Sequence, residues 1–568
     1  MGWMLGCAGK TDPALLEKLG TLCGAKPLST NEFMTVWGGG LPRTFHHTVG
    51  ADSRSGWLAC GIGFRSGPQS VRMMNRQDWA DFLAAPDPDP NHLNGHFAYL
   101  RWQDQHLHFR SDPIGLRSLY FLDRSDHLIF STRQDWLLSL QEKKALDWGE
   151  FGAHWLAINQ FSHGSFFKGL DRISQGGRAT YANGTFSHQN TPWHPDLAPP
   201  LFGDDFSQNL KAFTLAPLPE ETTLSLALSG GLDSRVLLAI LLAGPDRSWE
   251  VHSFKEPGHP DRRIAESICR ANDLKQVLLP QPVPDAGTCL RSMREYLGQT
   301  MMAAPAFGFI NLQFYDVLRE KGRVVVDGGA GEIARRRFLT RLLLGGKKHI
   351  RNGDSQQAFP LLRGRRADIF TPEVVQEMEN GARRALAHLW EKMPAVGETG
   401  IPNWLDLMAI RCRFSNLFGP EQSRSDSLLT NFMPFVQPSL LRSVFHTPLR
   451  QRQGGRIFRR IIAQNASGLT RFPLVKNDLI YPYRFSTVPA SLWIAGKSRL
   501  GFAPVDHTPA LFLNTIGEYV RDLAASQAVR EYTPYRKGYI AEMVDDFYGG
   551  NHARAGEIGW WLTFDFWR

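Results

Sequence analysis

Cysteine is scarce in this sequence, and long apolar runs are absent. The 568 residues include six cysteines, no two of which form a CxxC pair, so neither a disulfide framework nor a cysteine-ligated zinc site is indicated. No apolar run reaches the roughly 20 residues that would span a bilayer. The first ten residues have neither the basic start nor the long apolar core of a secretory signal. We therefore expect a cytoplasmic protein with no membrane partner.

The composition is that of a globular protein, with 42% hydrophobic and 21% charged residues. It excludes a disordered chain or a fibre, and the length predicts two to four domains. The formal charge is +9, and much of the excess lies between Arg335 and Arg366. This stretch is either a solvated face or a funnel for an anionic substrate. Nucleic acid is not indicated, because neither a zinc finger nor an RNP-type aromatic signature accompanies the charge.

The hydrophobic pattern changes near residue 200. Before it, short alternating segments such as His106–Arg110 and His127–Ser131 predict the strands of a layered sheet. A proline-rich segment follows, and beyond it apolar strands alternate with helices, which predicts a parallel sheet with helices on both faces. The expected strands are Thr223–Leu228, Trp249–Phe254, Gln276–Leu279 and Gly322–Val326. We predict an α/β protein with domains 1–195 and 205–568, mostly helical from about residue 400.

The most informative segment is a glycine turn between the first of these strands and the helix after it. It reads Leu228-Ser229-Gly230-Gly231-Leu232-Asp233-Ser234. Glycines let the backbone approach a ligand closely, and the N–H groups of such a turn and of a helix N-terminus can bind a phosphate. Asp233, among these donors, is placed to hold a divalent cation between phosphates. The Walker pattern GxxxxGK[ST] is absent, and we favour a phosphate site over an ordinary strand–helix turn.

The glycine turn resembles the pyrophosphate-binding PP-loop of ATP pyrophosphatases, and more narrowly that of the asparagine synthetase family. Other segments are similar to motifs of that family and occur in the same order along the chain. They are residues 94–99, 110–120, 130–131, 167–177, 324–332, 433–435, 455–459, 472–476 and 559–567. The SGGLDS turn alone is individually specific, and the other segments indicate the family through their shared order.

The resemblance implies a two-domain enzyme that uses ATP and Mg²⁺. An N-terminal Ntn-type αββα sandwich would carry a glutaminase. A C-terminal PP-loop domain, with a parallel sheet and a helical C-terminal region, would adenylate a carboxylate, after which an amine displaces AMP. The partners are then a small-molecule or peptide carboxylate and an amine donor. A homodimer or a pathway protein partner stays open.

The chain departs from the family at its N-terminus. The family's glutaminase needs a cysteine as first mature residue, because the free α-amine serves as base for the thiolate. Residue 2 here is Gly2, Leu5 falls where the nucleophile should be, and Cys7 is internal. We therefore predict no glutaminase activity, as in the related β-lactam synthetases and lasso-peptide cyclases, whose substrates already carry the amine. Use of free ammonia is an alternative, and a glutamine-dependent amidotransferase is disfavoured.

A second departure concerns the metal. The family's GxGxDE loop supplies an aspartate that shares Mg²⁺ with the PP-loop aspartate, and that position falls on Gly331. Asp327 and Glu332 are the candidates to replace it, beside Gly328 and Gly329 of the same loop. The alternative for Glu332 is a carboxylate that merely favours a helix N-terminus. If neither residue serves, the chain would be an inactive nucleotide-binding homologue.

Lys476 is predicted to be catalytic, together with Glu332. A cation fixed near the reacting carbonyl and phosphate stabilises charge that develops in the transition state. The alternative is a surface lysine, and a slip of the alignment would move the role to Arg471 or Arg484. Ser253 and Phe254 end a predicted strand, where α/β sheets bind ligands, so we expect backbone contact with adenine there.

Overall fold

A computed structural model describes residues 2–568 apart from 68–69, 159, 199–200, 204, 217–221, 246–247, 280, 313–314, 365 and 503–505. No described helix has the length and apolar character needed to cross a membrane.

The N-terminal region contains two antiparallel sheets. In the first, the strands lie in the order β11 (Asp171–Ile173), β9 (Leu119–Asp123), β10 (His127–Ser131), β1 (Trp3–Gly9), β3 (Met34–Gly39) and β2 (Ser29–Thr30). In the second, the order is β13 (Thr185–Gln189), β12 (Arg178–Ala182), β8 (His106–Ser111), β7 (Asn94–Gln103), β5 (Ser55–Ser66) and β4 (Phe45–Val49), and β6 (Val71–Met73) pairs with β5. The sequence segments predicted as strands near residues 106–131 are confirmed.

The two sheets stack face to face and are covered by helices on their outer faces. Alternation along each strand gives every sheet two apolar faces. Phe109 and Phe130 fill the core between the sheets. On one outer face Leu19 of α1 (Pro13–Cys23) shares a cluster with residues of β1. On the other, Trp79 of α2 (Arg76–Leu83) packs against Phe97. The predicted αββα sandwich is therefore confirmed.

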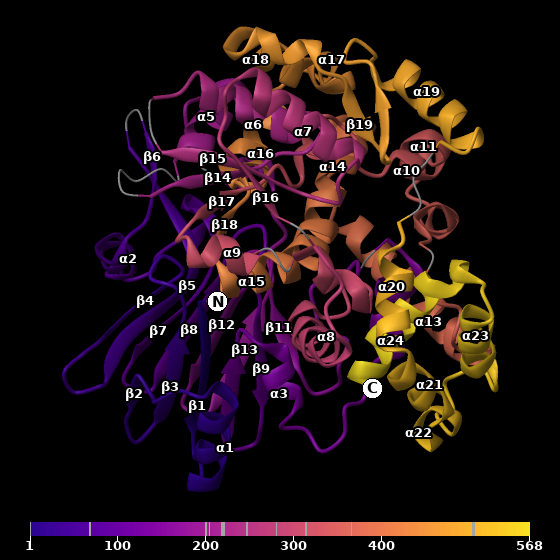
Figure 1. The fold of residues 1–568 in the computed structure, drawn as a ribbon. Coiled ribbons are helices and arrows are strands. Elements are labelled where there is room, and N and C mark those ends of the chain that lie inside the picture. Colours follow the sequence, from indigo (N-terminus) through magenta and orange to yellow (C-terminus); the bar gives the residue numbers. More distant parts are fainter. Residues whose placement is uncertain are drawn as a thin grey trace.

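The second region is built on a parallel sheet, above the N-terminal sheets in Figure 1. Its order is β16 (Gln276–Leu279), β15 (Trp249–Phe254), β14 (Leu224–Ala227), β17 (Val324–Val326) and β18 (Thr430–Phe432), with all four pairings parallel. Val236 of α6 (Leu232–Leu242) and Ile264 of α7 (Pro260–Ala271) pack with one face. Leu318 of α9 (Tyr315–Glu320) packs with the other. The predicted parallel sheet with helices on both faces is confirmed.

The rest of the chain is mainly helical, as predicted. The remaining helices are α3 (Gln134–Leu138), α4 (Trp148–Leu156), α5 (Phe206–Leu215), α8 (Ala286–Thr300), α10 (Thr340–Gly345), α11 (Lys347–Arg351), α12 (Ser355–Ala358), α13 (Pro372–Glu391), α14 (Val396–Ala409), α15 (Gly419–Leu428), α16 (Pro438–His446), α17 (Leu449–Arg452), α18 (Arg456–Asn465), α19 (Thr487–Arg499), α20 (Thr508–Thr515), α21 (Gly517–Ala525), α22 (Gln527–Arg530), α23 (Tyr539–Tyr548) and α24 (Ala555–Trp567). A π-helical segment, η6 (Ile410–Phe418), joins α14 to α15. A short hairpin pairs β19 (Leu474–Lys476) with β20 (Leu479–Tyr481).

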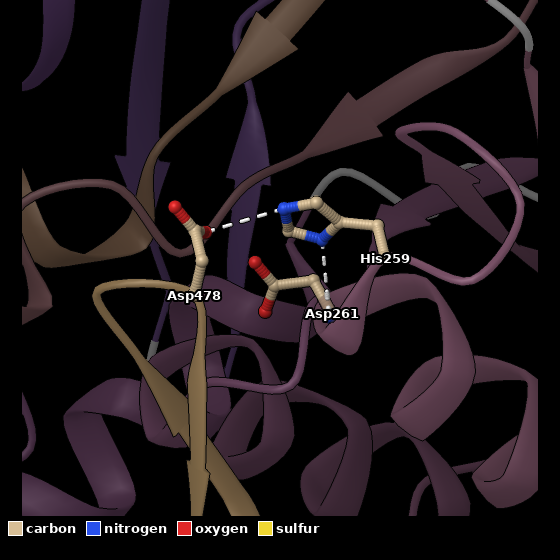
Figure 2. A group of neighbouring side chains, drawn as sticks. All are labelled: His259, Asp261 and Asp478. Atoms are coloured by element: carbon tan, nitrogen blue, oxygen red, sulfur yellow. Dashed lines mark hydrogen bonds and ion pairs between the residues drawn. The ribbon is translucent and has the colours of Figure 1, made fainter. Parts of the chain in front are cut away.

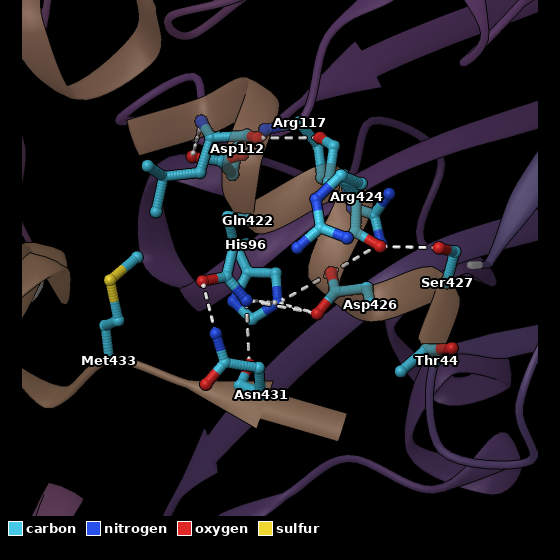
Figure 3. A network of polar contacts seen from close by, with 12 residues as sticks. Thr44, His96, Asp112, Arg117, Gln422, Arg424, Asp426, Ser427, Asn431 and Met433 are labelled. Carbon is cyan, nitrogen blue, oxygen red and sulfur yellow. Dashed lines mark hydrogen bonds and ion pairs between the residues drawn. The ribbon is translucent and has the colours of Figure 1, made fainter. Parts of the chain in front are cut away.

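A buried polar network connects the two regions (Figure 3). His96 of β7 and Arg117 bind Asp426 of α15 with N–O distances of 2.9 and 2.5 Å. Gln422, one turn earlier on α15, donates to Asp426 at 3.0 Å and to the carbonyl of Asn431 at 2.8 Å. These side chains are almost fully buried. Each charged side chain has its partner in the other region. The network therefore fixes how the N-terminal sheets lie against the region of the parallel sheet.

Candidate functional site

The glycine turn leaves the start of α6 without a side-chain cap. β14 ends at Ala227, and α6 begins at Leu232 after Gly231, whose position as N-cap offers no side chain to the first N–H groups of the helix. An uncapped helix start has N–H donors and the positive end of the helix dipole available for an anion. The structure therefore places the predicted phosphate-binding segment 228–234 at the edge of the sheet where strands end.

Hydrogen bonds within the turn fix its shape. The N–H of Ser229 donates to Oγ of Ser234 at 3.2 Å, and the N–H of Gly231 donates to Oγ of Ser229 at 3.1 Å. The N–H of Gly230 donates to Oδ1 of Asp261 at 2.8 Å. The two serine hydroxyls thus hold the loop itself, so that the backbone needs no rearrangement to receive a ligand.

The second glycine-rich loop packs directly against Asp233. A Cβ at Gly331 would lie 2.5 Å from Cγ of Asp233, and one at Gly328 would lie 3.0 Å from the N of Ser234. Oδ1 of Asp327 accepts from the N–H of Gly329. The position that the family fills with a metal-binding aspartate is therefore closed to any side chain here, because the carboxylate of Asp233 occupies that space.

Asp233 is a partly buried and incompletely satisfied carboxylate. Its Oδ2 is paired with Nη2 of Arg335, while its Oδ1 is buried and has no hydrogen-bond partner among the described residues. Burial raises the pKa of Asp233 to about 6; Arg335 opposes that rise and Glu332 adds to it. A buried oxygen without a partner is costly, and it is the kind of atom that a cation would satisfy.

The predicted metal ligands do not form a compact group by themselves. Among the described residues, the group of three whose ligand atoms all lie within 4.8 Å of one another is instead His259, Asp261 and Asp478 (Figure 2). There the N–H of Asp261 donates to Nδ1 of His259 at 3.2 Å, so the proton sits on Nε2, which lies 3.2 Å from Oδ1 of Asp478. This group fastens the β19–β20 turn to the start of α7, and the carboxylate of Asp261 supports Gly230.

The hairpin that carries Lys476 is hydrogen-bonded to the glycine turn. The N–H of Val475 donates to the carbonyl of Gly230 at 3.0 Å. Arg235 of α6 donates to the carbonyls of Phe472 and Pro473, both at 2.7 Å. The structure thus brings the backbone next to Lys476 into contact with the turn, although the two are far apart along the chain; the catalytic role of Lys476 stays a prediction.

Two arginines that sequence reasoning did not single out join this site. Burial lowers the pKa of Lys476, and Arg337 and Arg335 lower it further, which places the three cations close to one another. Burial also lowers the pKa of Arg337. The high density of basic residues was visible in the sequence. Nothing in their spacing indicated which of these side chains are buried.

The basic stretch divides between site and surface. Arg335, Arg336 and Arg337 are buried or half-buried, and Arg336 pairs with Asp406 at 3.2 Å. The solvated-face interpretation is therefore wrong for these three residues. It holds for the exposed cations that follow, which are Arg341, Lys347, Lys348, Arg351 and Arg363. Arg365 lies outside the described residues.

Ser253 and Phe254 end β15 beside the turn. Oγ of Ser253 donates to the carbonyl of Leu228 at 3.2 Å and accepts from Gln276 at 3.1 Å. The Ser253 side chain is thus engaged within the sheet, which leaves the backbone for the predicted adenine contact; that contact stays a prediction.

The N-terminal strand presents no reactive thiol at its start. Gly2 is buried, and a Cβ there would lie 1.8 Å from the carbonyl oxygen of Thr44. Leu5 is fully buried within β1. Burial raises the pKa of Cys7 to about 12, and a thiol that stays protonated is a poor nucleophile. Cys7 is therefore a poor candidate for a nucleophile, and the lack of glutamine hydrolysis stays a prediction.

Comparisons with known proteins add little to this geometry. No protein-family model matches the chain, and a search of curated proteins found no match. Among solved structures, it is similar to "the allosteric regulatory enzyme of purine biosynthesis", with 10% identity and a TM-score of 0.23 over 51% of this chain and 76% of that one. It is also similar to a glutamine phosphoribosylpyrophosphate amidotransferase from B. subtilis in complex with ADP and GMP, with 11% identity and a TM-score of 0.22 over 57% and 81%. Likenesses this weak carry no argument about function, and the site has to be interpreted from its own residues.

Proposed function

We propose that the protein is an ATP-dependent ligase that adenylates a carboxylate, releases pyrophosphate and lets an amine displace AMP. One observation carries the proposal: the hairpin with Lys476 is hydrogen-bonded to the glycine turn at Gly230. It brings the backbone that would bind the phosphates next to the lysine that would stabilise the developing charge, and adenylation requires both elements.

The turn and the start of α6 bind the phosphates in this proposal. Their N–H groups and the helix dipole favour a polyphosphate, and Arg335 and Arg337 balance its charge from the side of the second loop. Lys476 lies over the reacting centre, where negative charge develops on the carbonyl and phosphate oxygens. Because the loop is already fixed by its own hydrogen bonds, these donors act without reorganisation.

Mg²⁺ fits the site through Asp233. Its Oδ1 is buried and has no partner among the described residues, and Glu332 lies close enough to raise its pKa. Asp233 and Glu332 would hold the ion, and Asp327 is the third candidate ligand. When bound, Mg²⁺ supplies charge neutralisation for the phosphate oxygens.

The amine comes without glutamine hydrolysis in this proposal. Burial raises the pKa of the Cys7 thiol to about 12, which makes it a poor nucleophile for glutamine. The amine is therefore one already present on the substrate, as in macrolactam or β-lactam formation, or free ammonia. The test combines ATP and Mg²⁺ with a panel of small-molecule and peptide carboxylates and measures pyrophosphate and AMP together. Glutamate release that depends on Cys7 would instead establish a glutamine-dependent amidotransferase.

A catalytically inactive nucleotide-binding homologue is the second candidate. It is favoured by Asp233, whose carboxylate fills the space beside Gly331 and is already paired with Arg335. Binding of ATP without pyrophosphate release, across the same panel and with the free amine supplied, would support this candidate against the ligase.

A further inference from the structure

A cavity of about 640 Å³ lies between α13 and the N-terminal region, and it shares no lining residue with the glycine turn. One wall is a single face of α13, where residues three or four apart lie side by side. The opposite wall comes from two segments of the N-terminal region, residues 161–164 and 188–192. The volume is in the range of sites that enclose a drug-sized ligand, about 300–1,000 Å³.

Backbone contact between two helices makes this cavity rigid at one end. A Cβ at Gly152 of α4 would lie 2.0 Å from the carbonyl oxygen of Met378, and one at Gly381 of α13 would lie 2.1 Å from the carbonyl oxygen of Gly149. Neither helix can therefore shift toward the other, and the cavity is formed before any ligand arrives.

Arg411 contributes a guanidinium donor to this cavity. Its side chain lies on the π-helical segment η6, a kind of distortion that is frequent at functional sites, and only 4% of the residue is exposed. Nε donates to the carbonyl of Trp193 at 3.0 Å and Nη1 to the carbonyl of Lys392 at 2.6 Å. Nη2 makes no hydrogen bond to any described residue and is not one of the buried atoms left without a partner. Because Arg411 lines the cavity, this accessible N–H group is available to a ligand.

Glu150 and His163 add two further polar groups. Oε1 of Glu150 accepts from Gln160 at 3.2 Å and from Ser162, while its second oxygen has no partner in the described part of the chain. Burial raises the pKa of this carboxylate. A bound cation beside it would lower that pKa again. Burial lowers the pKa of His163 to about 3, so its imidazole is neutral and serves as a hydrogen-bonding group.

Exposed charges of both signs lie at the mouth of the cavity. Arg384 of α13 and Lys392, directly after α13, are exposed, and so is Asp147. Glu391 lies beside His388, with 3.5 Å between its Oε2 and Nδ1 of His388. The lining carries three cations, Arg384, Lys392 and Arg411, and two carboxylates, Asp147 and Glu150, so it favours a ligand with more carboxylates than ammonium groups.

We propose that this cavity binds an acidic amino acid or a short acidic peptide with a free ammonium group. One carboxylate of the ligand pairs with Arg411, the ammonium pairs with Glu150, and further carboxylates lie on the cations of α13. The site is separate from the proposed ligase site, and its ligand need not be a substrate.

Isothermal titration of the full chain tests the proposal with stated probes: L-glutamate, triglutamate, N-acetyl-triglutamate, trilysine and inorganic phosphate. Triglutamate should bind, L-glutamate should bind more weakly, N-acetylation should weaken binding at least tenfold, and trilysine should not bind. The proposal is overturned if neither glutamate nor triglutamate binds at millimolar concentration, if the acetylated peptide binds as tightly as the free one, or if phosphate binds as tightly as triglutamate.

Variants assign the binding to this cavity. Glu150→Gln and Lys392→Ala should each weaken triglutamate at least tenfold, while Lys348→Ala, an exposed cation on α11, should bind like the wild type. Arg411 also holds two carbonyls, so Arg411→Lys is tested only after its thermal unfolding midpoint has been compared with that of the wild type. Wild-type affinity in both Glu150→Gln and Lys392→Ala would overturn the proposal whatever Arg411→Lys shows.

Discussion

Two carboxylates, the fully buried Asp426 and the partly buried Asp233, each pair with an arginine, yet they are satisfied to different degrees. Asp426 accepts from His96, Arg117 and Gln422, so both its oxygens have partners. Asp233 has Arg335 on one oxygen and nothing among the described residues on the other. Asp426 is a fully satisfied carboxylate at the junction of the two regions, whereas Asp233, at a helix start, keeps one oxygen for a ligand. Under the proposed function, the same pair of residue types serves the fold in one place and chemistry in the other.

The largest effect is expected at Asp233. Asp233→Asn removes the negative charge but keeps the shape, so it should abolish ATP-dependent pyrophosphate release while the circular dichroism spectrum stays that of the wild type. The matched control is Asp261→Asn, which perturbs the neighbouring turn without touching Asp233. Full turnover in Asp233→Asn would contradict a role for this carboxylate in catalysis.

Asp426 should show the opposite pattern, a loss of stability. Asp426→Ala leaves Arg117 buried without a counter-charge, which typically costs about 3–5 kcal/mol, measured as the free energy of unfolding in urea. The double variant Asp426→Leu with Arg117→Met should recover most of that loss, because it removes both charges. Equal destabilisation in the single and double variants would mean that packing, and not the ion pair, matters here.

Lys476→Ala should slow catalysis with little effect on the apparent KM for ATP. Loss of one preorganised donor typically costs about 10²–10³ in kcat, or roughly 3–4 kcal/mol. Lys476→Arg should rescue poorly, because a planar guanidinium does not replace a compact ammonium. Arg471 and Arg484 are exposed, so Arg471→Ala and Arg484→Ala are the controls. A large loss in either of them, with normal kcat in Lys476→Ala, would show that the motif was aligned wrongly.

The raised pKa of Asp233 predicts that the free energy of unfolding depends on pH. Burial raises this pKa from 3.8 to about 6, so the folded protein binds more protons than the unfolded chain between these pH values. The contribution of Asp233 to stability is therefore complete below about pH 4 and falls as the pH rises through 6, by up to about 3 kcal/mol. Urea unfolding between pH 4 and 7 should show this decrease in the wild type and not in Asp233→Asn. Parallel pH profiles for the two proteins would contradict the raised pKa.

Regular elements were predictable from sequence where the local pattern decides them. The strands Trp249–Phe254 and Gln276–Leu279 have the predicted bounds. The fourth strand begins two residues later than predicted, at Val324. The glycine turn was recognisable because glycines, serines and an aspartate occur together between a predicted strand and a predicted helix.

Long-range pairings were not predictable. Nothing local in Arg335 or Arg337 distinguishes them from the exposed Lys347, because burial depends on how the second loop packs against α6. Likewise His96 and Asp426 meet only once the two regions have docked. Asp261 supports Gly230 across a separation of 31 residues, while the cap of α7 is His259.

The nucleotide product formed from [α-³²P]ATP tests the central claim most directly. The wild-type chain is incubated with Mg²⁺, the carboxylate panel and free amines, and the labelled nucleotides are separated. The account predicts labelled AMP in the wild type and none in Asp233→Asn. Labelled ADP in place of AMP, or no binding of ATP at millimolar concentration, would contradict it.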